Sequence, residues 1–371
     1  MTARVQTWQL RAEFAAALSR LYAAEVPMYS TLVEVSAEVN RELGATERVI
    51  MERHGAIRVG SPRELADVAD LFAAFGMFPV GFYDLRDAGS PVPVVSTALR
   101  PIDSEELEHN PFRVFTSMLA TADERFFAPE LRARVEGFLA GRQLFDPTLI
   151  AEARRIASDA GTDRDSADRF IAAAVDAFAL SREPIDRAWY DELAHVSAVA
   201  ADIAGVRSTH INHLTPRVLD IDELYARMTD RGITMIGAIQ GPPRTSGPAV
   251  LLRQTSFRAL AEPRRFRAPD GAVYDGTLRV RFGEVEARGV ALTRAGRARY
   301  DAAMADRDNW HRYFPGTDAE MAVEGLAYYR GGNPAKPGSE HLAKLHAETK
   351  STRCAMGARC GKPAKPRAKP R

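Results

Sequence analysis

His54-Gly-Ala-Ile-Arg58-Val59 and His213-Leu-Thr-Pro-Arg217-Val218 are two similar phrases of this chain. In each phrase an arginine follows the histidine by four residues, and a valine follows the arginine. An acidic stretch with helical periodicity comes next in both copies, followed by a glycine and another apolar run. This repeat of strand, helix and strand predicts a duplicated module, and duplicated modules commonly place equivalent residues around one shared site. Because the equivalent residue is histidine, we expect that site to hold a metal.

Composition favours a soluble globular protein. The 371 residues are 46% hydrophobic and 27% charged, values typical of one large or two ordinary domains. No run of about 18 apolar residues predicts a membrane span, and the N-terminus lacks the pattern of a secretory signal. Both cysteines, Cys354 and Cys360, lie close to the C-terminus, so the body of the chain needs no disulfides. We therefore expect a cytoplasmic protein with no membrane partner.

The charge is unevenly distributed along the chain. Residues 331–371 carry ten Lys/Arg and two Asp/Glu, a charge of +8, so the overall charge of +1 leaves −7 for residues 1–330. An acidic body is not typical of a nucleic-acid-binding domain, which carries a basic face within its fold. The tail is rich in Pro, Gly and Lys and is predicted to be disordered.

Periodicity divides the rest of the chain. Apolar residues at helical spacing predict two N-terminal helices, and Ser61-Pro62 predicts the start of a helix in the first module. We expect further strands at 78–85, 93–99, 234–240, 250–257 and 277–286. The predicted organisation is N-terminal helices at 1–48, a first module at 49–103, a helical insertion at 104–207, a second module with a C-terminal helix at 208–330, and the basic tail at 331–371.

A carboxylate is the natural third ligand beside two histidines. The predicted strand around residue 284 offers Glu284 and Glu286, which share a face because side chains alternate along a strand. Such a pair is also compatible with a solvated edge strand. Two histidines and a carboxylate leave open positions for substrate and O₂, as in non-haem Fe(II) oxygenases, although the same ligands also suit Zn²⁺ or Mn²⁺.

His210 is an alternative to His213 as a ligand. It lies three residues earlier on the same predicted strand and therefore on the opposite face, so we expect it in the core or beside the site. None of the remaining histidines has a partner at metal-ligand spacing.

Arg58 is the principal candidate for substrate binding. Four residues along a strand from His54, it lies on the same face at a distance of about 13 Å. A guanidinium aimed into a cavity can hold a carboxylate by two parallel hydrogen bonds, although a structural salt bridge is also compatible with the pattern. Other polar candidates near the cavity are Arg217, Gln254, Thr255 and Ser256. No nucleotide-binding glycine loop, Walker sequence or nucleophile elbow is present, which argues against dehydrogenases, kinases and α/β hydrolases.

The repeated phrases resemble the βαβββ module of the vicinal oxygen chelate superfamily. More narrowly, the chain resembles the iron-dependent 2-oxoadipate dioxygenase/decarboxylase family over about residues 15–330. Four phrases carry this resemblance: Glu52-Arg-His-Gly-Ala-Ile-Arg58-Val, His210-Ile-Asn-His213-Leu-Thr-Pro-Arg217, Leu252-Arg-Gln-Thr-Ser-Phe257 and Arg281-Phe-Gly-Glu-Val-Glu-Ala-Arg-Gly-Val-Ala-Leu-Thr293.

The resemblance implies an α+β fold in which two βαβββ-type modules form a half-barrel around one Fe(II). The implied ligands are His54, His213 and one glutamate, and both His54 and Arg58 are implied to contact the substrate. Phe282-Gly-Glu284-Val-Glu-Ala-Arg288 is similar to the strand that supplies the iron-binding glutamate of 4-hydroxyphenylpyruvate dioxygenase. We therefore expect Glu284 as the third ligand, with Glu286 beside the site or paired with Arg288.

The implied reaction is oxidative decarboxylation of 2-oxoadipate with O₂, giving 2-hydroxyglutarate and CO₂ in lysine catabolism. From Gly331 onward the chain departs from the family pattern, whose C-terminal segment is expected to contact the substrate. Two alternatives therefore stand beside the dioxygenase: a Zn- or Mn-dependent isomerase or lyase of the glyoxalase type, and a catalytically disabled protein that binds a metal or a 2-oxo acid. The sequence leaves the choice between monomer and homo-oligomer open.

Overall fold

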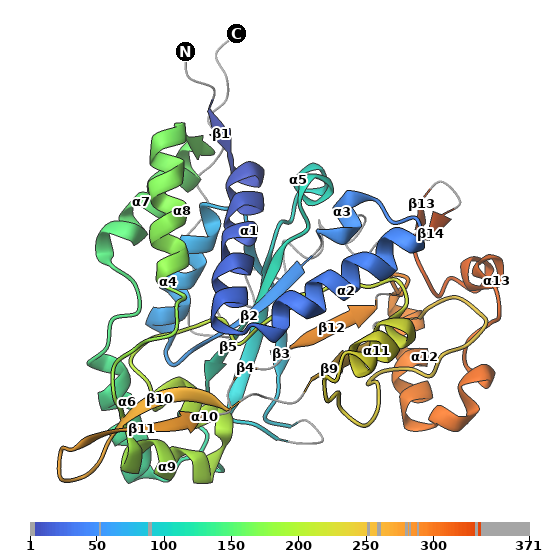
Figure 1. Ribbon diagram of the computed structural model, residues 1–371. Helices are drawn as coiled ribbons and strands as arrows, with labels where there is room; N and C mark the ends of the chain where they lie inside the picture. Colours follow the sequence, from blue (N-terminus) through green and yellow to red (C-terminus); the bar gives the residue numbers. More distant parts are fainter. Residues whose placement is uncertain are drawn as a thin grey trace.

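The structure is a computed structural model that describes residues 4–51, 53–87, 91–250, 253–257, 261–278, 281, 283–287, 289–330 and 333–334. A twisted sheet runs through the middle of the molecule, with helices packed around it (Figure 1). This mixed arrangement of helices and strands is the predicted α+β class.

The central sheet brings the two repeated phrases side by side. Its strand order is β3-β4-β5-β2-β8. These strands are β2 (Arg53–Val59), β3 (Phe78–Asp84), β4 (Val94–Arg100), β5 (Arg113–Leu119) and β8 (His213–Pro216). Strand β2 pairs in parallel with β5, which sets His54 opposite Arg113, and antiparallel with β8, which sets Ala56 opposite His213. The two strands that begin at or next to the repeated histidines are therefore direct neighbours.

The strand with the two glutamates lies on the far side of β8. This strand, β12 (Glu284–Ala287), pairs antiparallel with β9 (Arg253–Ser256). A parallel bridge joins Arg217 to Glu286, and the backbone N–H of Val218 donates to the carbonyl of Glu286 at 3.0 Å. Strands β2, β8, β12 and β9 thus follow one another across the molecule, and the first three carry the predicted ligands.

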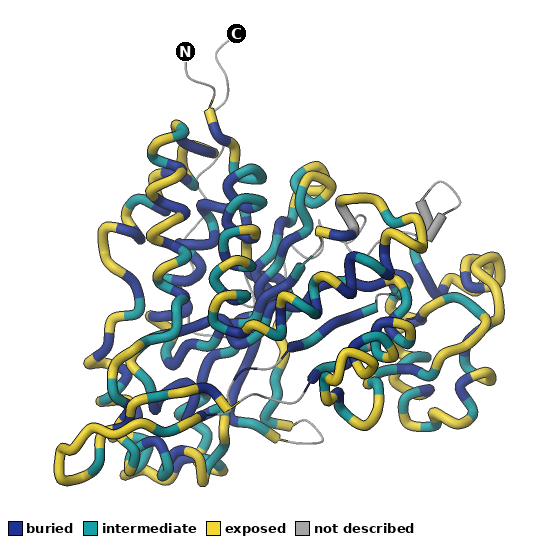
Figure 2. Tube along the Cα trace, in the orientation of Figure 1, coloured by how far each residue is buried: buried dark blue, intermediate teal, exposed yellow. Residues whose placement is uncertain are grey.

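The two faces of the sheet have different environments. Ile57 and Val59 of β2 belong to the main hydrophobic core, which they share with helices on that side of the sheet. Because side chains alternate along a strand, His54 and Arg58 point to the other face. Figure 2 shows that buried residues are concentrated along the central strands and on the inner sides of the helices.

Most helices of the N-terminal half cover the core face. The helices are α1 (Thr7–Glu25), α2 (Met28–Glu42), α3 (Glu47–Ile50), α4 (Pro62–Ala73), α5 (Ser104–His109), α6 (Pro129–Ala140), α7 (Pro147–Asp159), α8 (Arg164–Asp176), α9 (Arg187–Val196), α10 (Ala198–Ala204), α11 (Ile221–Asp230), α12 (Arg294–Ala305), η1 (Arg307–Arg312) and α13 (Asp318–Val323). The predicted start of α4 is confirmed, because the Ser61 side chain accepts from the Glu64 N–H and Pro62 occupies the first turn. This cap closes the strand-to-helix turn after β2.

A second cluster covers the far end of the site face. It combines Val94 and Leu119 of the sheet with side chains of α6, α9 and α10. The remaining strands are β1 (Val5–Gln6), β6 (Gly161–Thr162), β7 (Ile185–Asp186), β10 (Glu262–Arg267), β11 (Val273–Leu278), β13 (Tyr329–Arg330) and β14 (Asn333–Pro334). Of these, β10 and β11 form a hairpin that contributes Phe266 and Leu278 to the same cluster.

The structure differs from the sequence prediction in three places. The strand predicted at 234–240 does not form, and this segment has only isolated bridges at Met235 and Gln240. Within the predicted helical insertion at 104–207, β5 is a strand in the middle of the central sheet, paired with both β2 and β4. The composition of the whole span hid this strand, because a seven-residue segment contributes little to an average over a hundred residues. The strand predicted at 277–286 is also not continuous, since β11 pairs with β10 whereas β12 pairs with β9.

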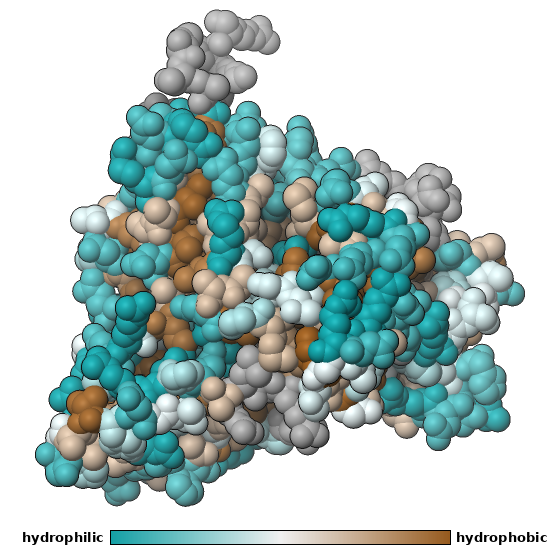
Figure 3. Space-filling view, in the orientation of Figure 1, coloured by the Kyte–Doolittle hydropathy of each residue, from teal (hydrophilic) through white to brown (hydrophobic). Residues whose placement is uncertain are grey.

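The surface in Figure 3 is mainly hydrophilic, with hydrophobic residues gathered between the helices on its left side. Within the described ranges, none of the helices combines the length and the apolar character that crossing a membrane requires. The predicted basic tail lies outside the described residues except for 333–334.

Candidate metal centre

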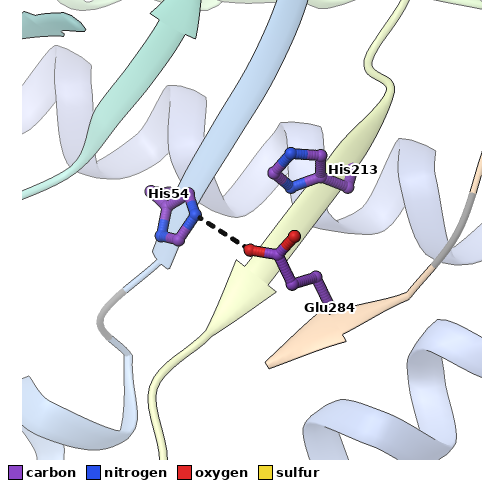
Figure 4. A group of neighbouring side chains, drawn as sticks. All are labelled: His54, His213 and Glu284. Atoms are coloured by element: carbon purple, nitrogen blue, oxygen red, sulfur yellow. Dashed lines mark ion pairs between the residues drawn. The ribbon is translucent and has the colours of Figure 1, made fainter. Parts of the chain in front are cut away.

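Three side chains converge on the site face of the sheet. His54 of β2, His213 of β8 and Glu284 of β12 each offer one ligand atom, and these atoms all lie within 4.8 Å of one another. Figure 4 shows the three side chains pointing toward one another from their separate strands. Residues that are distant in sequence meet here because β2, β8 and β12 are consecutive neighbours in space.

His54 is held between the two glutamates. Its Nε2 lies 3.8 Å from Oε1 of Glu284, and its Nδ1 lies 3.3 Å from Oε1 of Glu286. The edge-on ring of Phe115 packs against the imidazole at a centroid distance of 5.4 Å. Burial alone would lower the pKa of His54, but the charge of Glu286 and the proximity of both glutamate side chains outweigh it and raise the pKa above its ordinary value.

His213 is paired with a neutral hydroxyl on its Nδ1 side. Its Nδ1 lies 2.9 Å from Oγ1 of Thr215, so Nε2 is the ring nitrogen that Thr215 does not engage. The His213 and His54 rings are 5.8 Å apart between centroids and nearly perpendicular. Burial lowers the pKa of His213 to about 4, so this imidazole is neutral at pH 7 and can act as a ligand.

The two glutamates have different partners. Glu284 accepts a hydrogen bond from Nε2 of Gln254 at 2.7 Å and faces both histidines. Glu286 accepts from Nη2 of Arg113 at 2.9 Å and approaches only the Nδ1 side of His54. Burial opposes ionisation, but His54 and Arg113 lower the pKa of Glu286 to about 2. Glu286 is therefore ionised and held by Arg113 and His54, whereas Glu284 is the carboxylate that completes the cluster.

The donor set fits a divalent metal. Ligand atoms bound to one metal at about 2.0–2.2 Å are at most about 4.4 Å apart, so a small inward rotation of these side chains would close the site. Burial opposes ionisation of Glu284, but the nearby His54 and His213 lower its pKa, so it offers an ionised oxygen. Two imidazoles and a carboxylate suit Fe(II), Zn²⁺ or Mn²⁺.

Arg58 lies on the same face of β2 as His54, and a buried carboxylate holds it. Its Nη1 is ion-paired with Oδ2 of Asp202 in α10, and the Asp202 side chain is only 2% exposed. Nδ2 of Asn212 donates to the same aspartate oxygen at 2.8 Å. Asp202 engages one of the five N–H groups of the guanidinium, and the Arg58 side chain is 23% exposed.

His210 does not join the cluster. Its Nε2 lies 3.4 Å from Oδ1 of Asp202 and 3.3 Å from Nδ2 of Asn212. Asp202 and His210 also line a cavity of about 590 Å³, whose wall includes Arg264 and Arg267. The three clustered side chains are not part of that wall. His210 therefore lies beside the partner of Arg58 rather than beside Glu284.

The other predicted polar residues have separate places. Gln254 contacts Glu284, and Ser256 lies opposite Glu284 in the β9–β12 register. Thr255 is buried and lies opposite Val285, on the other face of the strand. Arg217, the residue that follows β8, forms a parallel bridge with Glu286 of β12. Gln254 is thus hydrogen-bonded directly to the cluster through Glu284.

Sequence reasoning missed Arg113, Asp202 and Thr215. Arg113 reaches the site because β5 pairs with β2, a parallel pairing that no local sequence pattern announces. Asp202 lies in a short alanine-rich helix with no motif around it. Thr215 had a usable signal, because it lies two residues after His213 and hence on the same face of a strand.

Comparisons with known proteins agree with the geometry. Residues 14–355 match the family model described as 2-oxoadipate dioxygenase/decarboxylase. A protein of that name from Mycobacterium tuberculosis (strain H37Rv) is 70% identical over 347 residues, which cover 90% of this chain and 84% of the relative. The resemblance predicted from the four phrases is thereby confirmed.

Two solved structures are similar in fold. The hydroxyglutarate synthase from Pseudomonas putida in complex with 2-oxoadipate has a TM-score of 0.77 and 37% identity, covering 89% of this chain and 80% of the other. A glyoxalase superfamily protein from Ralstonia eutropha has a TM-score of 0.60 at 18% identity, covering 77% of this chain and 84% of the other. The second likeness, at 18% identity, shows the fold alone.

Proposed function

The chain belongs to the 2-oxoadipate dioxygenase/decarboxylase family, and on that premise we propose that it converts 2-oxoadipate and O₂ to 2-hydroxyglutarate and CO₂. We propose Fe(II) as its metal, with His54, His213 and Glu284 as the ligands. The reaction balances without a further reductant, because oxidation of the substrate carbon chain supplies the electrons that reduce O₂.

One observation carries the proposal more than any other. Two histidines and a glutamate from three neighbouring strands offer ligand atoms within 4.8 Å of one another, on the face of the sheet that also carries Arg58. This is the ligand set of mononuclear Fe(II) oxygenases, which keeps positions open for a chelating substrate and for O₂. A structural zinc site would instead supply four protein ligands.

The metal and the protein have separate roles in this proposal. The chemistry supplied by Fe(II), when bound, is the activation of O₂ and the chelation of a 2-oxo acid. The protein positions the metal through its three ligands and limits access of water, since His54 is only 2% exposed. Gln254 holds one oxygen of Glu284 and thereby fixes the orientation of that carboxylate.

Arg58 provides the positive charge for a substrate carboxylate. Because Asp202 already fixes Nη1, the guanidinium is oriented before the substrate arrives, which reduces the entropy lost on binding. The Pseudomonas putida relative was solved in complex with 2-oxoadipate, a dianion that needs such a partner at each end. The metal would engage the 2-oxo end and Arg58 would engage a carboxylate, and the spacing between the two selects the chain length of the substrate.

Asp202→Asn is expected to raise the KM for 2-oxoadipate about tenfold, because a charge-assisted hydrogen bond that orients Arg58 is replaced by a weaker one. Metal content should stay at the wild-type level, since Asp202 does not contact the cluster. Steady-state kinetics with parallel metal analysis checks this. Asp191→Asn, which alters an exposed ion pair with Arg187, is the matched control. An unchanged KM in Asp202→Asn would show that Asp202 does not orient the arginine.

The choice of metal is tested by loading the metal-free protein anaerobically with Fe(II), Zn²⁺ or Mn²⁺. Only the Fe(II) form should consume O₂ when 2-oxoadipate is added. Turnover of the Zn²⁺ or Mn²⁺ form without O₂ would instead support the glyoxalase-type isomerase or lyase, which the likeness in fold makes the second candidate. Binding of metal and 2-oxoadipate without turnover would support the disabled protein.

The same proposal extends to a cytoplasmic enzyme of lysine catabolism. The family resemblance and a composition with only two cysteines, both near the C-terminus, support it. Deletion of the gene tests the place in lysine catabolism independently of the chemistry. A growth defect that depends on 2-oxoadipate would support it.

A further inference from the structure

We infer that Glu286 is a positioning residue of the metal centre: clamped by Arg113, it holds the Nδ1–H of His54 so that Nε2 faces the metal. This inference rests on the proposed metal centre and adds two residues, Glu286 and Arg113, that act on the metal through His54.

The two neighbouring glutamates determine which ring nitrogen of His54 carries the hydrogen. Its Nδ1 lies 3.3 Å from Oε1 of Glu286, while its Nε2 lies 3.8 Å from Oε1 of Glu284. Oε1 of Glu286 already accepts a hydrogen bond from Arg113 and lies within hydrogen-bond reach of Nδ1, whereas Glu284 lies beyond hydrogen-bond reach of Nε2, so Nδ1 carries the hydrogen and donates it. The lone pair of the neutral imidazole is then on Nε2, on the side of Glu284 and His213. Glu286 thereby selects the nitrogen that faces the metal.

The Glu286 side chain is itself held rigidly by its neighbours. Nη2 of Arg113 donates to the same Oε1 at 2.9 Å, and Arg113 lies opposite His54 in the β2–β5 register. The guanidinium also lies 5.3 Å from the centre of the Phe115 ring, whose edge packs against His54. The backbone carbonyl of Glu286 is fixed by the N–H of Val218. The carboxylate therefore has little freedom to leave His54.

His54 and His213 differ in the partner of Nδ1. Nδ1 of His213 is paired with the neutral hydroxyl of Thr215 at 2.9 Å, whereas Nδ1 of His54 is paired with a buried carboxylate. A carboxylate behind a metal-binding imidazole fixes its orientation and increases its basicity more than a hydroxyl does. His54 is thus the histidine that donates its electron pair to the metal more strongly, and it is the main ligand of the centre.

Glu286→Gln tests the inference because glutamine keeps the shape of the side chain and loses its charge. The probe is Co²⁺, a spectroscopic substitute for Fe(II), and its affinity is measured by competition with a chelator. We expect affinity to fall about 10- to 100-fold, with a changed visible spectrum of the Co²⁺ form. Glu286→Asp, which restores the charge at a shorter reach, should recover part of the affinity.

Glu64→Gln is the matched control. Glu64 is as buried as Glu286 and pairs with a buried arginine, Arg142, at 2.6 Å, but it contacts none of the three clustered side chains. This control should lose thermal stability and keep wild-type Co²⁺ affinity and spectrum. An equal loss of affinity in Glu64→Gln and Glu286→Gln would overturn the inference, because it would reduce the effect to the loss of any buried ion pair.

Two further outcomes decide the matter. If Glu286→Gln does not fold, Arg113→Gln replaces it, because this variant removes only the hydrogen bond that holds Glu286. Arg113→Gln is expected to weaken Co²⁺ binding several-fold. Unchanged Co²⁺ affinity in whichever variant folds would overturn the inference. Failure of the wild-type protein to bind Co²⁺ or Fe(II) would instead contradict the proposed metal centre, and this result is distinct from a variant that binds as tightly as wild type.

Discussion

His54→Ala and His213→Ala are each expected to abolish stoichiometric binding of Fe(II), and turnover with it. Either change leaves one imidazole and one carboxylate in the cluster, too few ligands to hold the metal against chelation by buffer and substrate. Iron content after anaerobic loading and desalting measures the binding. Circular dichroism checks that the variants fold, since both side chains lie on the site face and outside the main core.

His210→Ala is the matched control for these variants. His210 is as buried as His54, lies three residues from His213 and contacts Asp202 and Asn212. It should keep its iron, because it supplies no atom to the cluster. Loss of iron in His210→Ala together with retention in His213→Ala would mean that the wrong histidine has been assigned as the ligand.

Arg58→Ala is expected to keep iron and to lose affinity for 2-oxoadipate by about 10- to 150-fold. A hydrogen bond to a charged group contributes about 1.5–3 kcal/mol, and the variant also leaves the buried Asp202 without its cationic partner. The dissociation constant of 2-oxoadipate for the anaerobic Fe(II) protein measures the effect. Iron content should not change, because Arg58 contributes no ligand atom.

Arg58→Lys separates charge from geometry. Lysine keeps the positive charge but cannot form two parallel hydrogen bonds with a carboxylate, so its affinity for 2-oxoadipate should lie between those of alanine and arginine. Equal affinity in wild type, Arg58→Lys and Arg58→Ala would assign Arg58 to a structural ion pair with Asp202 and remove it from substrate binding.

The sequence was sufficient to predict that His54 and His213 belong together. Their phrases repeat the same spacing to an arginine and a valine, and repetition of a module carries information about symmetry in space. The structure sets Ala56 opposite His213, so the two repeated strands are adjacent. The predicted helix start at Ser61-Pro62 is also correct, because capping is a local property of the sequence.

The choice between Glu284 and Glu286 shows where local patterns end. Both residues lie on the same face of a strand, so periodicity alone cannot separate them. What separates them is the neighbour of each: Gln254 and the two histidines for Glu284, Arg113 and the Nδ1 side of His54 for Glu286. These neighbours come from other strands, and the resemblance to a known family was needed to favour Glu284 beforehand.

Arg113 and Asp202 were not predictable from the sequence. Their roles follow from contacts between residues far apart in sequence: His54 and Arg113 are 59 positions apart, and the helical composition of the span around β5 hid that strand. Asp202 acts across 144 positions on Arg58. Long-range pairing of this kind depends on how the strands are ordered in the sheet, and no local pattern of residues specifies that order.

The most direct test of the proposed dioxygenase is the stoichiometry of one reaction. Protein loaded anaerobically with Fe(II) is mixed with 2-oxoadipate and a known amount of ¹⁸O₂, with 2-oxoglutarate and 4-hydroxyphenylpyruvate as comparison substrates. The proposed chemistry predicts equal amounts of O₂ consumed, CO₂ released and 2-hydroxyglutarate formed, with both oxygen atoms of one O₂ molecule in the product. Conversion of 2-oxoadipate without O₂, or no conversion by protein that holds its iron, would contradict it.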